Sequence, residues 1–137
     1  IDLASVGKAL SLPELELMHI HKTGALIRAS AVLGARCGHD LDAKQFGRLE
    51  HYAKTVGLAF QVVDDVLDYD ASTATLGKTA GKDAAQEKPT YVSILGLTRA
   101  RVLAEQLRAQ AHAALSTFGA KAARLRELAD FIVLRKF

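Results

Sequence analysis

The stretch FQVVDDVLDYD, residues 60–70, decides how this chain is interpreted. Four of its side chains fall within one arc of an α-helix at about 100° per residue, while valines and a leucine fill most of the remaining circumference. These four are Gln61, Asp64, Asp65 and Asp68. Like charges one turn apart repel, and burying them is costly unless a cation lies between them. The pattern therefore favours a site for a divalent cation such as Mg²⁺, which takes oxygen ligands. A solvated acidic patch at a helix end is the alternative.

The composition predicts an all-α protein. Half of the 137 residues are hydrophobic, which is enough for one core, and there are only two prolines and no tryptophan. We therefore expect residues 1–137 to form a single helical domain. Because the chain begins at Ile1 rather than at a methionine, we expect it to be a fragment, the C-terminal half of a larger domain.

Several classes of protein are disfavoured. No apolar run approaches the roughly 18 residues of a membrane span, and no leader resembles a signal peptide, so we expect a cytoplasmic protein. Cys37 is the only cysteine, which excludes a disulfide framework or a thiolate metal site within one chain. The formal charge of +3 is dispersed and aromatic residues are few, which argues against nucleic-acid binding.

A first helix is predicted from Ser11 to about Arg36, because Ser11 and Glu14 have the spacing of a capping box and Pro13 suits a first turn. The polar sequence HKTG, residues 21–24, interrupts its apolar rhythm. Glycine in a helix interior costs about 1 kcal/mol relative to alanine. A close approach by a ligand or by another backbone would account for it. Taken alone, Lys22 is typical of an ordinary surface lysine.

A second helix is predicted from Ala43 to about Asp68, with Asp40 or Asp42 as its cap. The aspartates then occupy its last turns, where the helix dipole disfavours negative charge. Helix stability alone would not place three aspartates there. A purely structural role therefore does not explain why the acidic cluster occurs at this position.

The segment from Asp70 to Lys88 reads as a long irregular loop with glycine next to lysine at Gly77 and Gly81. Such pairs suit phosphate, because the backbone can approach closely and the ammonium group supplies charge. A flexible linker is the alternative. Three scaffold helices follow, and their predicted extents are Thr90 to about Gly96, Thr98 to about Ser116, and about Ala120 onward.

Taken in order, HKTGALIRAS, FQVVDDVLDYD and ATLGKTAGKD, with KPTY behind them, resemble the C-terminal half of the polyprenyl diphosphate synthases. Within that family the resemblance is strongest to the bacterial farnesyl diphosphate synthases (geranyltranstransferases). It implies the all-α isoprenoid-synthase fold, a homodimer and dependence on Mg²⁺. It also implies a prenyltransferase that condenses isopentenyl diphosphate with an allylic diphosphate, dimethylallyl or geranyl, to give farnesyl diphosphate.

The resemblance assigns roles residue by residue. The second aspartate-rich motif of the family, which holds Mg²⁺ against the allylic diphosphate, matches Asp64, Asp65 and Asp68. Residues that match contacts to the substrate diphosphate are Lys22, Thr23, Gln61, Lys78 and Lys88. By the same register, Asp83 and Asp2 match outer partners of the metal. No residue is assigned as a catalytic base, since in this family the departing diphosphate is held to take the proton.

One departure from the family pattern matters. The first aspartate-rich motif and the basic residues that bind isopentenyl diphosphate are absent from this sequence. We therefore expect the 137 residues to hold half of an active site and not to turn over alone. The alternatives are a geranylgeranyl or longer-chain synthase, a non-catalytic synthase-like subunit, and a structural helical domain with solvated aspartates.

Overall fold

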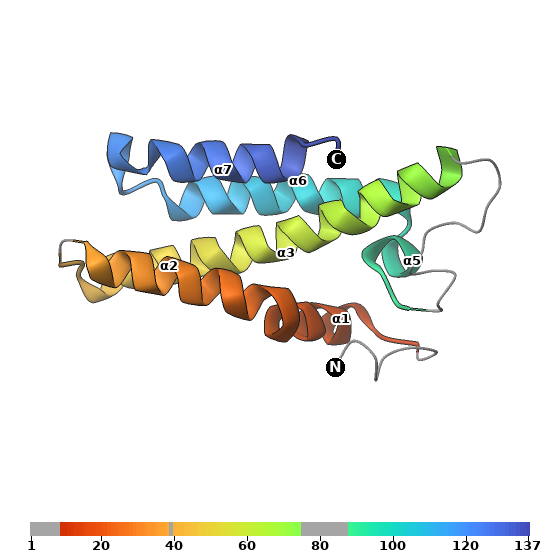
Figure 1. Cartoon of the computed structure of the whole chain (residues 1–137), viewed down its shortest axis with the longest axis horizontal. Helices are drawn as coiled ribbons and strands as arrows, with labels where there is room; N and C mark the ends of the chain where they lie inside the picture. The colour runs from red at the N-terminus through yellow and green to blue at the C-terminus, as the bar shows by residue number, and fades with distance from the viewer. Residues whose placement is uncertain (1–8, 39, 75–87) are drawn as a thin grey trace.

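The computed structural model describes residues 9–38, 40–74 and 88–137, and every regular element among them is helical (Figure 1). In chain order the elements are α1 (Leu12–His19), the π-helical turn η2 (Ile20–Gly24), α2 (Ala25–Cys37), α3 (Ala43–Ala74), α5 (Tyr91–Leu95), α6 (Leu97–Ala114), the 3₁₀ turn η3 (Gly119–Ala122) and α7 (Ala123–Leu134). The all-α prediction is thus confirmed.

Helix α3 is the centre of the molecule. It packs along α6 and also contacts α7 and α2, so that α1 and α2 lie on one side of it and α6 and α7 on the other (Figure 1). Its buried apolar residues recur every three or four positions, as a helical core stripe requires. The same is true of α6, where small residues let the two helices approach. The buried apolar residues of α6 are Ala100, Ala104, Leu107, Ala111 and Ala114.

The start of α1 follows the sequence prediction. Ser11 Oγ accepts a hydrogen bond from the Glu14 N–H, and a carboxylate oxygen of Glu14 accepts one from the Ser11 N–H at 2.8 Å. The Ser11 hydroxyl also donates to the Glu14 carboxylate at 3.0 Å, and the two hydrogen bonds that this carboxylate accepts lower the pKa of Glu14, the one from the Ser11 backbone contributing most. Two of the backbone N–H groups at this end of the helix are therefore satisfied by side chains.

The predicted helix from Ser11 to about Arg36 has nearly the right ends, but it is not a regular α-helix throughout. Residues Ile20–Gly24 form a π-helical turn between α1 and α2. A Cβ atom added at Gly57 of α3 would lie 3.4 Å from the Gly24 Cα, so the two backbones meet at a glycine on each side. Of the two explanations for a glycine in HKTG, the structure supports the approach of another backbone.

The predicted end of α3 at Asp68 is wrong, because the helix continues to Ala74. No glycine or proline stops it, and Asp70 forms an ion pair at 2.9 Å with Arg101 of α6. The aspartates are thus more than a turn from the helix end. The predicted loop is wrong over residues 70–74, which are helical. Residues 75–87, with Lys78 and Asp83, lie outside the described residues.

The predicted helix starts are partly confirmed. Asp42 rather than Asp40 precedes α3, where its Oδ1 accepts a hydrogen bond from the Gln45 N–H at 2.8 Å. Thr90 caps α5 in a capping box with Ser93, as expected.

Two predicted starts near the C-terminus are wrong. Thr98 does not cap α6, because Gly96, at φ +82°, both ends α5 and begins α6. The last helix begins at Ala123 instead of Ala120, because a 3₁₀ turn opens at Gly119. In neither case did the sequence show which residue would take the cap.

No helix in the described part of the chain combines the length and the apolar character needed to span a bilayer.

Candidate functional site

The arc of polar residues on α3 runs from solvent into the core. Asp64 is exposed, Asp68 is half-buried, and Asp65 is only 4% exposed. Gln61 is also buried. Helix geometry puts Asp64 and Asp65 at opposite edges of the arc with Asp68 between them, and the Asp65 edge is the one that contacts Tyr91 of α5. The three carboxylates are therefore not equivalent.

Asp65 is held on both oxygens by protein donors. Gln61 Nε2 donates to Oδ1 at 3.0 Å, and the backbone N–H of Tyr91 donates to Oδ2 at 2.9 Å. Tyr91 is the first residue of α5, so its N–H has no partner within that helix. The Asp65 carboxylate satisfies it and joins α3 to α5.

The other two aspartates lie open to a ligand. Neither the Asp64 nor the Asp68 side chain forms a hydrogen bond or ion pair with another residue in the described ranges. Mg²⁺ is commonly held by one or two carboxylates together with substrate phosphates, and two aspartates one turn apart suit that arrangement. Within those same ranges, no three histidine, cysteine, aspartate or glutamate side chains gather into a metal-binding group. The metal assignments remain predictions.

Lys22 and Thr23 lie in the π-helical turn η2, which packs against α3. Lys22 is exposed and Thr23 is half-buried. The contact between Gly24 and Gly57 places this turn beside α3 one helical turn before Gln61. Wide π turns occur frequently at functional sites. The structure thus brings the HKTG sequence next to the segment that leads into the aspartates.

The remaining predicted residues fall in two groups. Lys88 is half-buried and lies two residues before Thr90, the cap of α5, close in sequence to the Tyr91 contact with Asp65. Lys78, Asp83 and Asp2 lie outside the described residues, so their roles remain predictions.

The sequence interpretation missed the part played by His19 and Tyr91. Their rings stack with centroids 5.5 Å apart and planes inclined at 22°. Tyr91 is fully buried, and its hydroxyl has no hydrogen-bond partner among the described residues. Burial raises the pKa of Tyr91, and the charges of Glu16 and Asp65 raise it further. The available signal was KPTY, in which a bulky aromatic residue follows a helix cap.

A cleft of about 650 Å³ lies between the η2–α2 segment and the first half of α3. Its lining includes His21, Arg28 and Lys54 but none of the α3 aspartates. Arg28 is paired with Glu50 at 3.1 Å, and His21 Nδ1 lies 2.9 Å from the Leu17 carbonyl oxygen. This cleft is therefore separate from the aspartate arc.

The comparison with known families decides what this arrangement belongs to. The family described as "Polyprenyl synthetase" matches residues 1–129. The chain belongs to the polyprenyl synthetase family. The resemblance inferred from the three sequence motifs is confirmed.

Curated relatives in this family come from bacteria and plants. A protein of Sinorhizobium fredii named "Probable farnesyl diphosphate synthase" is 48% identical over 131 residues, covering 93% of this chain and 40% of that protein. A chloroplastic geranylgeranyl pyrophosphate synthase of Catharanthus roseus is 46% identical over 137 residues, covering 98% of this chain and 38% of that protein. The chain therefore spans about two fifths of the length of the curated relatives it matches.

Solved structures of polyprenyl synthetases share the fold. An FPP/GFPP synthase of Zymomonas mobilis aligns with a TM-score of 0.78 at 36% identity, covering 96% of this chain and 42% of that one. A Helicobacter pylori geranyltransferase, solved with magnesium and isoprenyl diphosphate, aligns with a TM-score of 0.74 at 30% identity, covering 97% of this chain and 43% of that one. The predicted isoprenoid-synthase fold is thus confirmed.

Proposed function

We propose that this chain belongs to a Mg²⁺-dependent prenyltransferase that condenses isopentenyl diphosphate with an allylic diphosphate to give farnesyl diphosphate. Family membership supports the reaction class. The relative complexed with magnesium and isoprenyl diphosphate supports the metal and the kind of substrate. The observation that carries the proposal is the open edge of the α3 arc, where Asp64 and Asp68 lie unpaired by other described residues.

The proposed chemistry requires positive charge at the diphosphate. Ionisation of an allylic diphosphate creates a carbocation and a heavily charged leaving group, and metal ions and lysines stabilise that charge as it develops. In this proposal Asp64 and Asp68 hold Mg²⁺, while Lys22, Thr23 and Lys88 contact the diphosphate oxygens. Lys78 and Gln61 have supporting roles on the same substrate.

We further propose that this chain supplies only one side of the active site. The only DDxxD cluster in the 137 residues is the one at Asp64, Asp65 and Asp68. A second carboxylate cluster and the site for isopentenyl diphosphate would come from residues beyond this sequence. The isolated chain is then expected to bind a diphosphate but not to catalyse condensation.

A longer product is the second candidate. The Catharanthus roseus geranylgeranyl synthase is 46% identical, against 48% for the Sinorhizobium fredii protein, so identity hardly separates the two products. Incubating the parent enzyme with isopentenyl and geranyl diphosphates, followed by chromatography of the products, would distinguish them. A 15-carbon product supports the proposal, and accumulation of a 20-carbon product supports the alternative.

The half-site is testable on the chain itself by calorimetric titration with inorganic diphosphate, with and without Mg²⁺. We expect Mg²⁺-dependent binding that Asp64→Ala weakens at least tenfold, since a lost carboxylate ligand is costly. Asp130→Ala is the matched control, because it removes a part-exposed aspartate on α7. Absence of Mg²⁺-dependent binding in the wild-type chain, or equal losses in both variants, would contradict the proposal.

The homodimer and the cytoplasmic location implied by the family resemblance remain predictions. The Catharanthus roseus relative is chloroplastic by name, so location differs among relatives of comparable identity.

A further inference from the structure

Asp65 differs from its neighbours in the motif in burial and in partners. We propose that Asp65 is a positioning residue that locks the start of α5 against α3, and that it does not ligate the metal directly. The part of this inference that concerns the metal rests on the proposed function. The geometric part concerns only Asp65, Gln61 and Tyr91 and stands independently.

Asp64 and Asp65 differ in their access to solvent. Magnesium ions dehydrate reluctantly and usually keep several waters, so a direct ligand needs an oxygen that faces a wet site. Asp64 offers one, because its side chain is exposed. Asp65 is 4% exposed, and both of its oxygens already accept hydrogen bonds from Gln61 and Tyr91. Moving it onto a metal would leave a buried backbone N–H unsatisfied, which costs about 1–3 kcal/mol.

Tyr91, the partner of Asp65, contacts more than one element of the site. Tyr91 follows the Lys88–Thr90 segment, donates its N–H to Asp65 on α3, and stacks its ring on His19 at the end of α1. His19 directly precedes the π turn that carries Lys22 and Thr23. One buried residue thus ties together the three elements that carry the described candidate ligands. Asp65 is the polar group that fixes this residue to α3.

The donors around Asp65 can be satisfied by a carboxylate or by an amide. Two of the groups that contact Asp65 are a backbone N–H and an amide NH₂, and both are donors. A carboxylate can accept from both at once. An asparagine could keep both contacts if Gln61 turned its amide over, since the asparagine Oδ1 would accept from Tyr91 and its NH₂ would donate to Gln61. If Asp65 were instead a direct metal ligand, the same substitution would remove the negative charge that holds the cation, and metal binding would weaken.

This difference defines the experiment. Four single variants of the full 137-residue chain would be compared, namely Asp65→Asn, Asp65→Ala, Asp64→Asn and Asp64→Ala. Calorimetry would give the Mg²⁺-dependent affinity for inorganic diphosphate. Hydrogen exchange followed by NMR would give the protection of the Tyr91 amide, a readout that a metal ligand would not change.

We expect Asp65→Asn to bind within about threefold of wild type and to keep Tyr91 protected, whereas Asp65→Ala exchanges Tyr91 at least about tenfold faster and binds about tenfold more weakly. Both Asp64 variants should lose binding and keep Tyr91 protected. If Asp65→Asn binds as weakly as Asp64→Asn, Asp65 is a direct ligand and the proposal is wrong.

Unchanged Tyr91 exchange in Asp65→Ala would also overturn the proposal. If Asp65→Ala does not fold, the Asp65→Asn comparison decides the question alone. If the wild-type chain shows no Mg²⁺-dependent binding, the proposed function fails, and the exchange data still decide whether Asp65 positions α5.

Discussion

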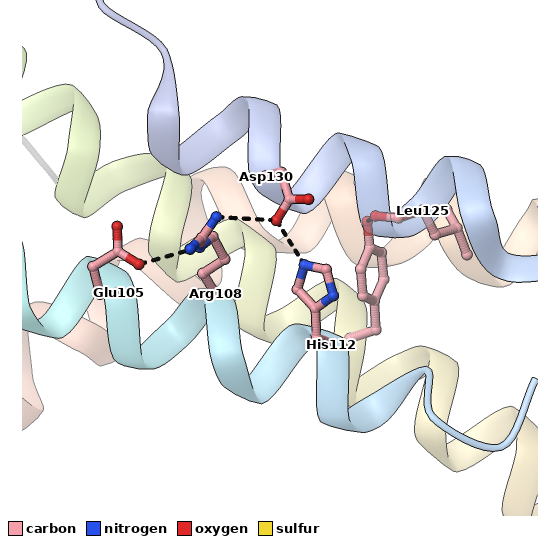
Figure 2. Close-up of polar contacts among 6 residues, drawn as sticks. Glu105, Arg108, His112, Leu125 and Asp130 are labelled. Carbon is pink, nitrogen blue, oxygen red and sulfur yellow. Dashed lines mark hydrogen bonds and ion pairs between the residues drawn. The ribbon is translucent and has the colours of Figure 1, made fainter.

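Two aspartates in this molecule, Asp65 and Asp130, accept hydrogen bonds in opposite surroundings. Asp65 is buried and accepts hydrogen bonds from a backbone N–H and from a side-chain amide. Asp130 on α7 is 40% exposed and faces two side chains of α6 that can carry positive charge (Figure 2). Its Oδ1 lies 2.7 Å from His112 Nε2 and 3.3 Å from Arg108 Nη1, and Arg108 also pairs with Glu105 at 3.1 Å.

The comparison shows that the number of charges near a carboxylate does not measure its importance. Exposed ion pairs are screened by water and salt, and most contribute about 0–1 kcal/mol. A buried donor left without its acceptor costs about 1–3 kcal/mol. The hydrogen bonds of the buried Asp65 should therefore contribute more to the free energy of unfolding than the exposed ion pairs between α6 and α7.

The largest expected effect is on the buried side of this comparison. Replacing the fully buried Tyr91 by alanine removes the ring that stacks on His19, and should lower the free energy of unfolding by about 3–5 kcal/mol in urea denaturation. Tyr91→Phe is the matched control and should change stability little, because the hydroxyl has no partner among the described residues. Similar losses in both variants would show that the hydroxyl, rather than the ring, is essential.

An intermediate effect on stability is expected at Tyr52 of α3, which joins this helix to α7 by donating its hydroxyl hydrogen to the Leu125 carbonyl oxygen at 2.7 Å. Tyr52→Phe should cost about 1 kcal/mol. Burial raises the pKa of Tyr52 to about 12 from a usual value of 10. Its contribution is therefore fully present below pH 10 and is lost as the pH rises toward 12. Denaturation at several alkaline pH values should show a smaller decline in the variant, and an identical decline would refute this assignment.

The smallest effect is expected in the exposed network. Asp130→Ala should lower the free energy of unfolding by less than about 1 kcal/mol, and the difference from wild type should shrink in 1 M salt. The measurement is the same urea titration at low and high salt. A loss as large as that of Tyr91→Ala would reverse the ranking of the two regions.

Local signals were enough to predict much of the fold. The all-α class, the caps at Ser11 and Thr90, and the core stripe of α3 depend on residues within a few positions of one another. The three motifs also identified the family, because their order and spacing are more specific than any one of them. Helix ends were less predictable, since α3 continues to Ala74 and Asp70 pairs there with Arg101, thirty-one residues later in the sequence.

The sequence predicted which residues belong to the candidate site but not which of its aspartates are buried and which are exposed. Helix periodicity placed Asp64, Asp65 and Asp68 on one arc, yet it could not show that Asp65 faces the core. That distinction comes from Tyr91, twenty-six residues later, and from the packing of α5 on α3. Tertiary contacts of this kind leave no periodic trace in a single sequence.

The π-helical turn Ile20–Gly24 breaks the α-helical count of residues between α1 and α2. Its hydrogen bonds span five residues where those of an α-helix span four, so the turn holds one residue more than a regular helix needs. Because the extra residue is taken up within the turn, α1 and α2 keep the faces that a regular helix one residue shorter would give them. A regular count carried from α1 into α2 is therefore out of step by one residue, or about 100°, although Leu15 and Met18 lie in the core.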